Sequence, residues 1–201
     1  MKKLFYLLFT LFAFSFNTKA HEGLHTGQVA SDFKLKNIDG KMVSMADYKN
    51  AKGFIVTFTC NHCPYAKAYE DRIIALNNKY AAKGYPVIAI NPNDAVQYPE
   101  DDFSSMKLRA KEKNFTFPYL HDESQDVARA YGAIKTPHIF IVQKENQQFI
   151  VKYIGAIDDN WEDATAVKEK YVENALDALL KGQPVAVANT KAIGCGVKWK
   201  K

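Results

Sequence analysis

The sequence has only one long apolar run, and that run lies at the start of the chain. Residues 4–16 are almost all apolar, two lysines precede them, and small residues occupy positions 18 and 20. A core of about 13 residues is short against the roughly 20 that a membrane-spanning helix needs, whereas this layout is typical of a signal peptide. We therefore expect residues 1–20 to be cleaved near Ala20, which predicts a periplasmic or secreted protein without stable membrane insertion.

The chain also lacks a strong charge of either sign. Its 27 basic residues stand against 22 acidic ones, and residues 1–20 hold three of the lysines and no acid, which leaves 24 against 22, a net charge of +2. No basic stripe alternates with aromatic residues, so the sequence predicts no nucleic-acid partner. No repeat, low-complexity tract or linker divides residues 21–201, which are numerous enough for one domain with its own core.

Cysteine is scarce, with only Cys60, Cys63 and Cys195 in the chain. A bridge between Cys60 and Cys63 would close too small a loop to stabilise much, because the gain in chain entropy grows with loop length. The pair therefore indicates redox chemistry in an oxidising compartment. Cys195 has two open interpretations: an additional thiol that resolves Cys60, carries electrons or links two subunits, or an unreactive thiol packed in the tail. The oligomeric state is not predicted.

Strand and helix patterns alternate along the chain. Asp39-Gly40 favours a tight turn in an N-terminal β-hairpin over residues 32–44. Strand patterns follow at 54–59, 87–90, 119–120, 139–142 and 149–154, and helix patterns at 64–83, 103–113, 125–131 and 164–180. This alternation predicts an α/β fold with a mixed central sheet flanked by helices. Residues 183–201 form a C-terminal tail without clear periodicity.

The segment T-C-N-H-C-P-Y lies where the predicted strand 54–59 meets the predicted helix from residue 64. We expect Cys60 to lie at the helix N-terminus, whose N–H groups and dipole favour a thiolate, the attacking species in disulfide exchange. Cys63 would then resolve the mixed disulfide. His62 either lowers the pKa of Cys60 further or simply faces solvent, and Asn61 is interpreted as a turn residue.

The ordered motifs resemble the thioredoxin-fold redoxin family, in the peroxiredoxin-like (AhpC/TSA-type) branch that carries C-x-x-C. The matching segments are N-H-C-P-Y at 61–65, F-P-Y-L-H-D at 117–122, A-Y-G-A at 130–133, T-P at 136–137 and I-G-C-G-V-K-W-K at 193–200. The resemblance implies a thioredoxin-like fold over most of the chain from about residue 23. It also implies a protein thiol or disulfide as substrate, a separate redox partner, and no cofactor other than the redox-active disulfide.

The same resemblance assigns a role to Thr136-Pro137. It implies a cis peptide bond that faces the cysteines, leaves the backbone of Thr136 free to pair with an extended substrate, and keeps the two thiols from trapping a metal. His138 either flanks this site or lies on the surface of an edge strand.

The sequence departs from peroxiredoxins and from thioredoxins, and these departures narrow the range of activities that we expect. Peroxiredoxins share the motif P-x-x-x-T-x-x-C and a peroxide-binding arginine. In this sequence Thr57 matches the threonine of the motif, but Gly53 stands in place of the proline. No arginine lies in the strand after Thr136-Pro137, and Arg72 and Arg129 are the nearby candidates. Many thioredoxins carry a buried acid at the position that Phe54 occupies here.

The predicted function is therefore an exported thiol–disulfide oxidoreductase that exchanges electrons with protein disulfides or dithiols through Cys60 and Cys63. Because strand 54–59 has no acid, the proton of Cys63 would pass to water, Glu70 or Asp71. One alternative is a thiol-dependent peroxidase, in which Thr57 would bind peroxide. The other is a Cu(I)-binding redoxin-like carrier with Cys60, Cys63 and a histidine as ligands, since thiolates and imidazole suit Cu(I); no metal site is predicted in the preferred interpretation.

Overall fold

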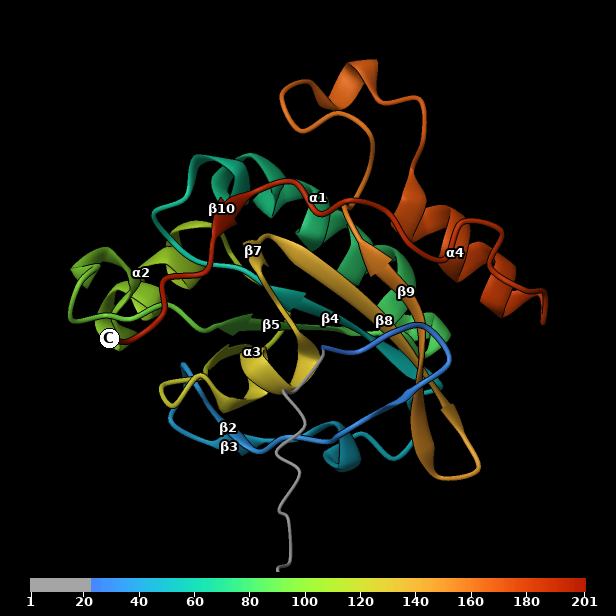
Figure 1. Ribbon diagram of the computed structural model, residues 1–201, viewed down its shortest axis with the longest axis horizontal. Coiled ribbons are helices and arrows are strands. Elements are labelled where there is room, and N and C mark those ends of the chain that lie inside the picture. Colours follow the sequence, from blue (N-terminus) through green and yellow to red (C-terminus); the bar gives the residue numbers. More distant parts are fainter. Residues whose placement is uncertain (1–22) are drawn as a thin grey trace, which may run out of the picture.

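The computed structural model describes residues 23–201, so the predicted signal peptide lies outside the described residues. Within this range eight strands form one mixed sheet in the order β1-β9-β8-β4-β5-β6-β2-β3, and β7 and β10 form a separate ribbon (Figure 1). The strands are β1 (Val29–Ala30), β2 (Leu35–Asn37), β3 (Met42–Val43), β4 (Gly53–Phe58), β5 (Val87–Asn91), β6 (Tyr119–His121), β7 (Lys135–Thr136), β8 (His138–Glu145), β9 (Gln148–Gly155) and β10 (Cys195–Gly196). The helices are α1 (Pro64–Tyr80), α2 (Phe103–Glu112), α3 (Asp126–Tyr131) and α4 (Tyr171–Leu180).

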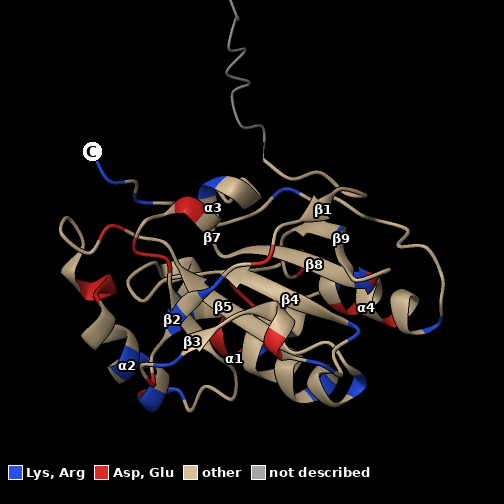
Figure 2. Cartoon of the chain, turned by 90° about the horizontal axis from the view of Figure 1, so that it is seen from below, with Lys and Arg blue, Asp and Glu red and all other residues tan. Residues whose placement is uncertain are grey.

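The sheet is buried on both faces, because side chains alternate along each strand. Ile55 of β4 and Val87 of β5 point to the face that α1, α2 and α4 cover, while Val56 and Ile88 point to the face under α3 and the N-terminal segment. Charged residues lie mainly on the helices and loops (Figure 2), and neither β4 nor β5 contains one. None of the described helices is long and apolar enough to cross a membrane.

Two sequence expectations about single elements have different outcomes. The hairpin is confirmed: β2 and β3 pair antiparallel around a turn at which Gly40 has φ of +87°, a conformation that glycine adopts without steric cost. The helix expected over 164–180 is only partly correct, since α4 begins at Tyr171. Residues 159–169 instead form a loop that contains one 3₁₀ turn at Ala164–Ala166. Asp159 holds this loop, since its N–H donates to the Glu169 carbonyl and its carboxylate accepts from Lys168 N–H.

Parallel pairing brings the carboxyl ends of β4 and β5 to one edge of the sheet. Ile55 to Phe58 pair with Val87 to Ile90, so the chain leaves β4 towards Cys60 beside the loop that leaves β5 at Asn91. Ligand sites of open α/β sheets occur at this kind of edge. The fold therefore places the C-x-x-C segment next to the loop that follows β5.

Gly53 begins β4 in a position that admits no side chain. A Cβ there would overlap the carbonyl oxygen of Val142 and lie 2.5 Å from the Tyr85 ring. The crowding explains why glycine stands at the position where the peroxiredoxin motif has proline.

Replacing Gly53 with alanine should lower the free energy of unfolding by about 1–3 kcal/mol, the usual cost of overpacking a filled core. Urea denaturation of Gly53→Ala and of the wild type measures this difference. Gly196→Ala is the matched control, because no atom lies within 4 Å of a Cβ at that position. Equal stability of Gly53→Ala and wild type would contradict the packing argument.

Candidate active site

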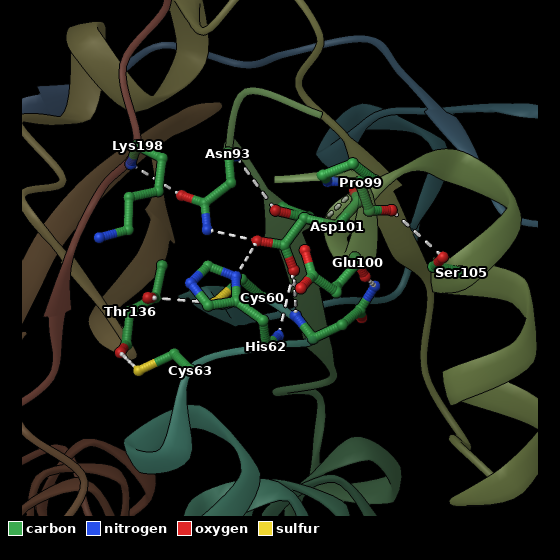
Figure 3. Close-up of polar contacts among 12 residues, drawn as sticks. Cys60, His62, Cys63, Asn93, Pro99, Glu100, Asp101, Ser105, Thr136 and Lys198 are labelled. Carbon is green, nitrogen blue, oxygen red and sulfur yellow. Dashed lines mark hydrogen bonds and ion pairs between the residues drawn. The ribbon is translucent and has the colours of Figure 1, made fainter. Parts of the chain in front are cut away.

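The Cys60 and Cys63 thiols lie together against Thr136 (Figure 3). The Cys60 sulfur is 3.3 Å from the Thr136 hydroxyl, and the Cys63 sulfur is 3.2 Å from the Thr136 carbonyl oxygen. The Thr136–Pro137 peptide bond is cis. Both thiols are buried: Cys60 is 2% exposed and Cys63 is 0% exposed, so an incoming sulfur would meet Cys60 first.

The expectation that Cys60 lies at the helix N-terminus is wrong. Helix α1 begins at Pro64, and Cys63 is its N-cap residue with φ of −64° and ψ of 126°. Helical backbone angles are disfavoured for a residue before proline, which keeps Cys63 just outside the helix. The first N–H groups of α1 therefore favour a negative charge on Cys63 more than on Cys60.

The two thiols have opposite tendencies to ionise. A hydrogen bond from the Cys60 thiol lowers the pKa of Cys63 despite its burial, and the Cys195 thiol and the Ala66 N–H lower it further. The same bond raises the pKa of Cys60, as do its burial and the nearby charge of Asp101. The interaction between the two thiols therefore lets the reduced pair share one proton and favours the charge on Cys63 over Cys60.

Asp101 is a buried acid that the sequence analysis did not identify as part of the site. One carboxylate oxygen accepts from the backbone N–H groups of Asn61 at 2.7 Å and His62 at 3.2 Å. The other lies 2.5 Å from His62 Nδ1 and accepts from the Asn93 amide at 2.7 Å (Figure 3). The carboxylate thus fixes the segment between the two cysteines to the loop that follows β5.

His62 is held on two sides. Asp101 binds its ring nitrogen, and Tyr98 stacks on the ring at a centroid distance of 5.1 Å and an angle of 11°. A sulfur of Cys60, a ring nitrogen of His62 and an oxygen of Asp101 lie within 4.8 Å of one another. This arrangement differs from the copper ligand set of two cysteines and a histidine, and its carboxylate is already engaged by four N–H groups.

Asn61 is more than a turn residue. It is buried, its side-chain oxygen accepts from the Tyr119 hydroxyl at 2.9 Å, and its amide donates to the Glu100 carbonyl at 2.8 Å. Tyr119 lies on β6, two strands from the cysteines in the sheet order. Asn61 therefore ties the C-x-x-C segment to the neighbouring strands.

The structure also tests the expectations for Thr136, for His138 and for the acid that would accept the proton of Cys63. Thr136 pairs with Cys195 across the β7–β10 ribbon, so its backbone is not free for a substrate strand. His138 is a buried residue of β8, an interior strand of the sheet, and not an exposed edge residue. Glu70 is paired with Arg109, and Asp71 is bound by Lys113, so both acids are engaged away from the thiols.

A peroxide-binding arginine has no counterpart at the site. The chain contains three arginines. Arg72 binds Asp158, Arg109 binds Glu70, and Arg129 stacks over the Trp199 ring. Thr57 is buried with no hydrogen-bond partner for its hydroxyl among the described residues, which fits a β-branched residue of a core strand.

Asp101→Asn should lower the free energy of unfolding by about 1–3 kcal/mol, because the new amide would point its N–H groups at the Asn93 amide and leave a buried donor unpaired. Urea denaturation measures the loss. Asp102→Asn is the control, since asparagine replaces aspartate well at the N-cap of α2, where Asp102 accepts from Ser105 N–H. Equal losses in the two variants would contradict a special role for Asp101.

His138 should make the fold sensitive to acid. Burial lowers the pKa of His138 to about 4, so between about pH 6.5 and 4 the unfolded chain binds a proton that the folded chain does not, and stability falls as the pH falls. Wild type should lose up to about 3 kcal/mol more than His138→Leu over this interval, as measured by urea denaturation. Parallel pH profiles of the two proteins would exclude His138 as the cause.

Comparison with known proteins adds family membership to this geometry. The model of the AhpC/TSA family matches residues 26–159. The thiol–disulfide oxidoreductase ResA of Bacillus cereus is 26% identical over 139 residues, which are 69% of this chain and 75% of that protein.

Solved structures agree with this comparison. An uncharacterised conserved protein of Geobacillus kaustophilus has a TM-score of 0.81 and 40% identity, with 88% of this chain and 93% of that chain covered. A putative thiol:disulfide interchange protein DsbE of Chlorobium tepidum, at 21% identity and a TM-score of 0.62 over 79% of this chain and 99% of its own, shares the thioredoxin-like fold. The predicted fold and family are confirmed, and the chain belongs to the AhpC/TSA family of redoxins.

Proposed function

We propose that this protein is an exported thiol–disulfide oxidoreductase that exchanges electrons with protein disulfides or dithiols through Cys60 and Cys63. The observation that carries the proposal is the contact of both buried thiols with Thr136, Cys60 at its hydroxyl and Cys63 at its carbonyl oxygen. The activity named for the ResA relative supports it. Export is inferred from the apolar run at residues 4–16.

Thr136 offers a different partner to each thiol, and this allows the shared proton to move. When the proton passes from Cys60 to Cys63, the Cys63 thiol donates to the Thr136 carbonyl. The Cys60 thiolate is then stabilised by the Thr136 hydroxyl, a contact that lowers its pKa. Transfer of one proton between neighbouring sulfurs thus moves the nucleophile to the more exposed cysteine.

The exchange then follows in two steps. The Cys60 thiolate attacks one sulfur of a substrate disulfide, a Cys60–substrate disulfide forms, and the second substrate sulfur leaves as a thiolate that takes the proton of Cys63. The Cys63 thiolate then attacks the Cys60 sulfur, the Cys60–Cys63 disulfide forms, and the substrate leaves with both sulfurs reduced. A separate dithiol restores the pair.

Two groups serve this reaction by position. Asp101 orients His62 and holds its ring beside the Cys60 sulfur, where an imidazolium would offset the charge of the carboxylate.

The missing arginine argues against peroxide as the main substrate, since no described arginine contacts either thiol.

Insulin reduction in the presence of dithiothreitol tests the proposal. Cys60→Ser should lose at least 100-fold of the catalysed rate, because the attacking thiolate is gone, whereas Ser104→Ala on the exposed face of α2 should retain it. Cys63→Ser should accumulate a Cys60–insulin disulfide, visible by mass spectrometry. Full activity of Cys60→Ser would overturn the proposal, and hydrogen peroxide consumption faster than insulin reduction would favour the peroxidase.

A further inference from the structure

The C-terminal tail lies over the two active-site thiols as an extended strand. Cys195 and Gly196 of β10 pair antiparallel with Thr136 and Lys135 of β7, and the ribbon passes beside the start of α1 (Figure 1). Gly194 lies so close to Thr136 that a Cβ would overlap the Thr136 carbonyl oxygen. The tail therefore takes the place beside Thr136 that the family resemblance assigns to an extended substrate.

The tail is anchored by specific contacts of the residues that follow Cys195. Val197 N–H donates to the Ile134 carbonyl at 3.2 Å. The Lys198 carbonyl accepts from Asp94 N–H at 2.9 Å and from the Gln125 amide at 2.8 Å. Lys198 N–H donates to the Asn93 side chain at 2.9 Å (Figure 3). These bonds fix the path of the tail, so the position of Cys195 is set by the fold.

Cys195 packs directly against the redox pair. It joins Cys60, Cys63 and Ala66 in one small cluster, and it is half-buried where the other two thiols are fully covered. After the Cys60 thiol, the Cys195 thiol and backbone N–H are among the groups that lower the pKa of Cys63. A third thiol that packs against the redox pair is a candidate partner in disulfide exchange with it.

We propose that Cys195 is a third redox thiol, which forms a disulfide with Cys63 and fastens the tail across Thr136. The proposal deepens the proposed function and rests on it. In the oxidised protein the Cys195 thiolate attacks the Cys63 sulfur of the Cys60–Cys63 disulfide; the Cys63–Cys195 bond forms, the Cys60–Cys63 bond breaks, and Cys60 leaves as a thiolate. No electron is gained or lost, so this exchange needs no further oxidant.

The new disulfide would change what the oxidised protein can bind. With Cys63 and Cys195 joined, the strand that occupies the Thr136 edge is held covalently, and a folded protein substrate cannot displace it. Cys60 meanwhile carries a free thiol without a resolving partner. A dithiol reductant that attacks the half-buried Cys195 sulfur would return the enzyme to its reduced form and release the tail.

Oxidation of Cys60→Ser by oxidised glutathione tests the assignment. Cys195 should attack glutathione disulfide and release one glutathione, and Cys63 should then attack the Cys195 sulfur and release the second. Mass spectrometry after maleimide labelling should find both thiols lost without a glutathione adduct, and peptide mapping should find Cys63 linked to Cys195. The Cys60→Ser/Cys195→Ser protein is the control and can form no internal link.

Three outcomes decide the matter. A glutathione adduct or two free thiols in Cys60→Ser would overturn the third-thiol proposal, as would a Cys60–Cys195 link formed efficiently in Cys63→Ser.

In the otherwise native chain, Cys195→Ser should reduce insulin several-fold faster than wild type, because its tail can no longer be fastened. An unchanged rate would overturn the regulatory consequence.

The proposed function is measured separately by wild-type insulin reduction. If wild type reduces insulin but Cys60→Ser forms no Cys63–Cys195 link, the third-thiol proposal alone fails. If the link forms but wild type has no insulin activity, the proposed function alone fails.

Discussion

Thr136 is the residue on which the arrangement of the site depends. Its hydroxyl meets Cys60, its carbonyl meets Cys63, and its backbone pairs with Cys195, so three thiols from two distant parts of the sequence converge on one residue. The convergence follows from the topology, because β7 leads into β8, which lies next to β4 in the sheet, and β4 leads into Cys60. A displacement of Thr136 would alter these contacts of all three thiols at the same time.

The order of elements could be predicted from sequence because it depends on local patterns. The β-branched run of β4, the helical spacing of α1 and the Asp39-Gly40 turn all carry their signal within a few residues. The start of α4 was not predicted, because the loop before it is held by Asp159 through contacts that compete with an amphipathic pattern. The start of α1 at residue 64 was predicted correctly, and the proline there already indicated that Cys63, not Cys60, precedes the helix directly.

The site was predicted only where a motif names its members. Cys60, Cys63 and Thr136 stand in short recognisable segments, whereas Asp101 stands among several acids in a loop and is distinguished only by burial. Its position after a central parallel strand was the one signal available. The pairing of Thr136 with the tail could not be foreseen, because a two-residue strand has no periodicity and its partner lies 59 positions away in sequence.

Asn93 has a consequence beyond holding two segments in place. Its amide group donates to Asp101 and accepts from Lys198, so the tail and the carboxylate that orients His62 share one side chain. A ligand that lifts Lys198 away would remove the donor to the Asn93 oxygen and leave the amide that holds Asp101 free to turn. The tail and the carboxylate that orients His62 beside Cys60 are thus physically connected through one side chain, Asn93.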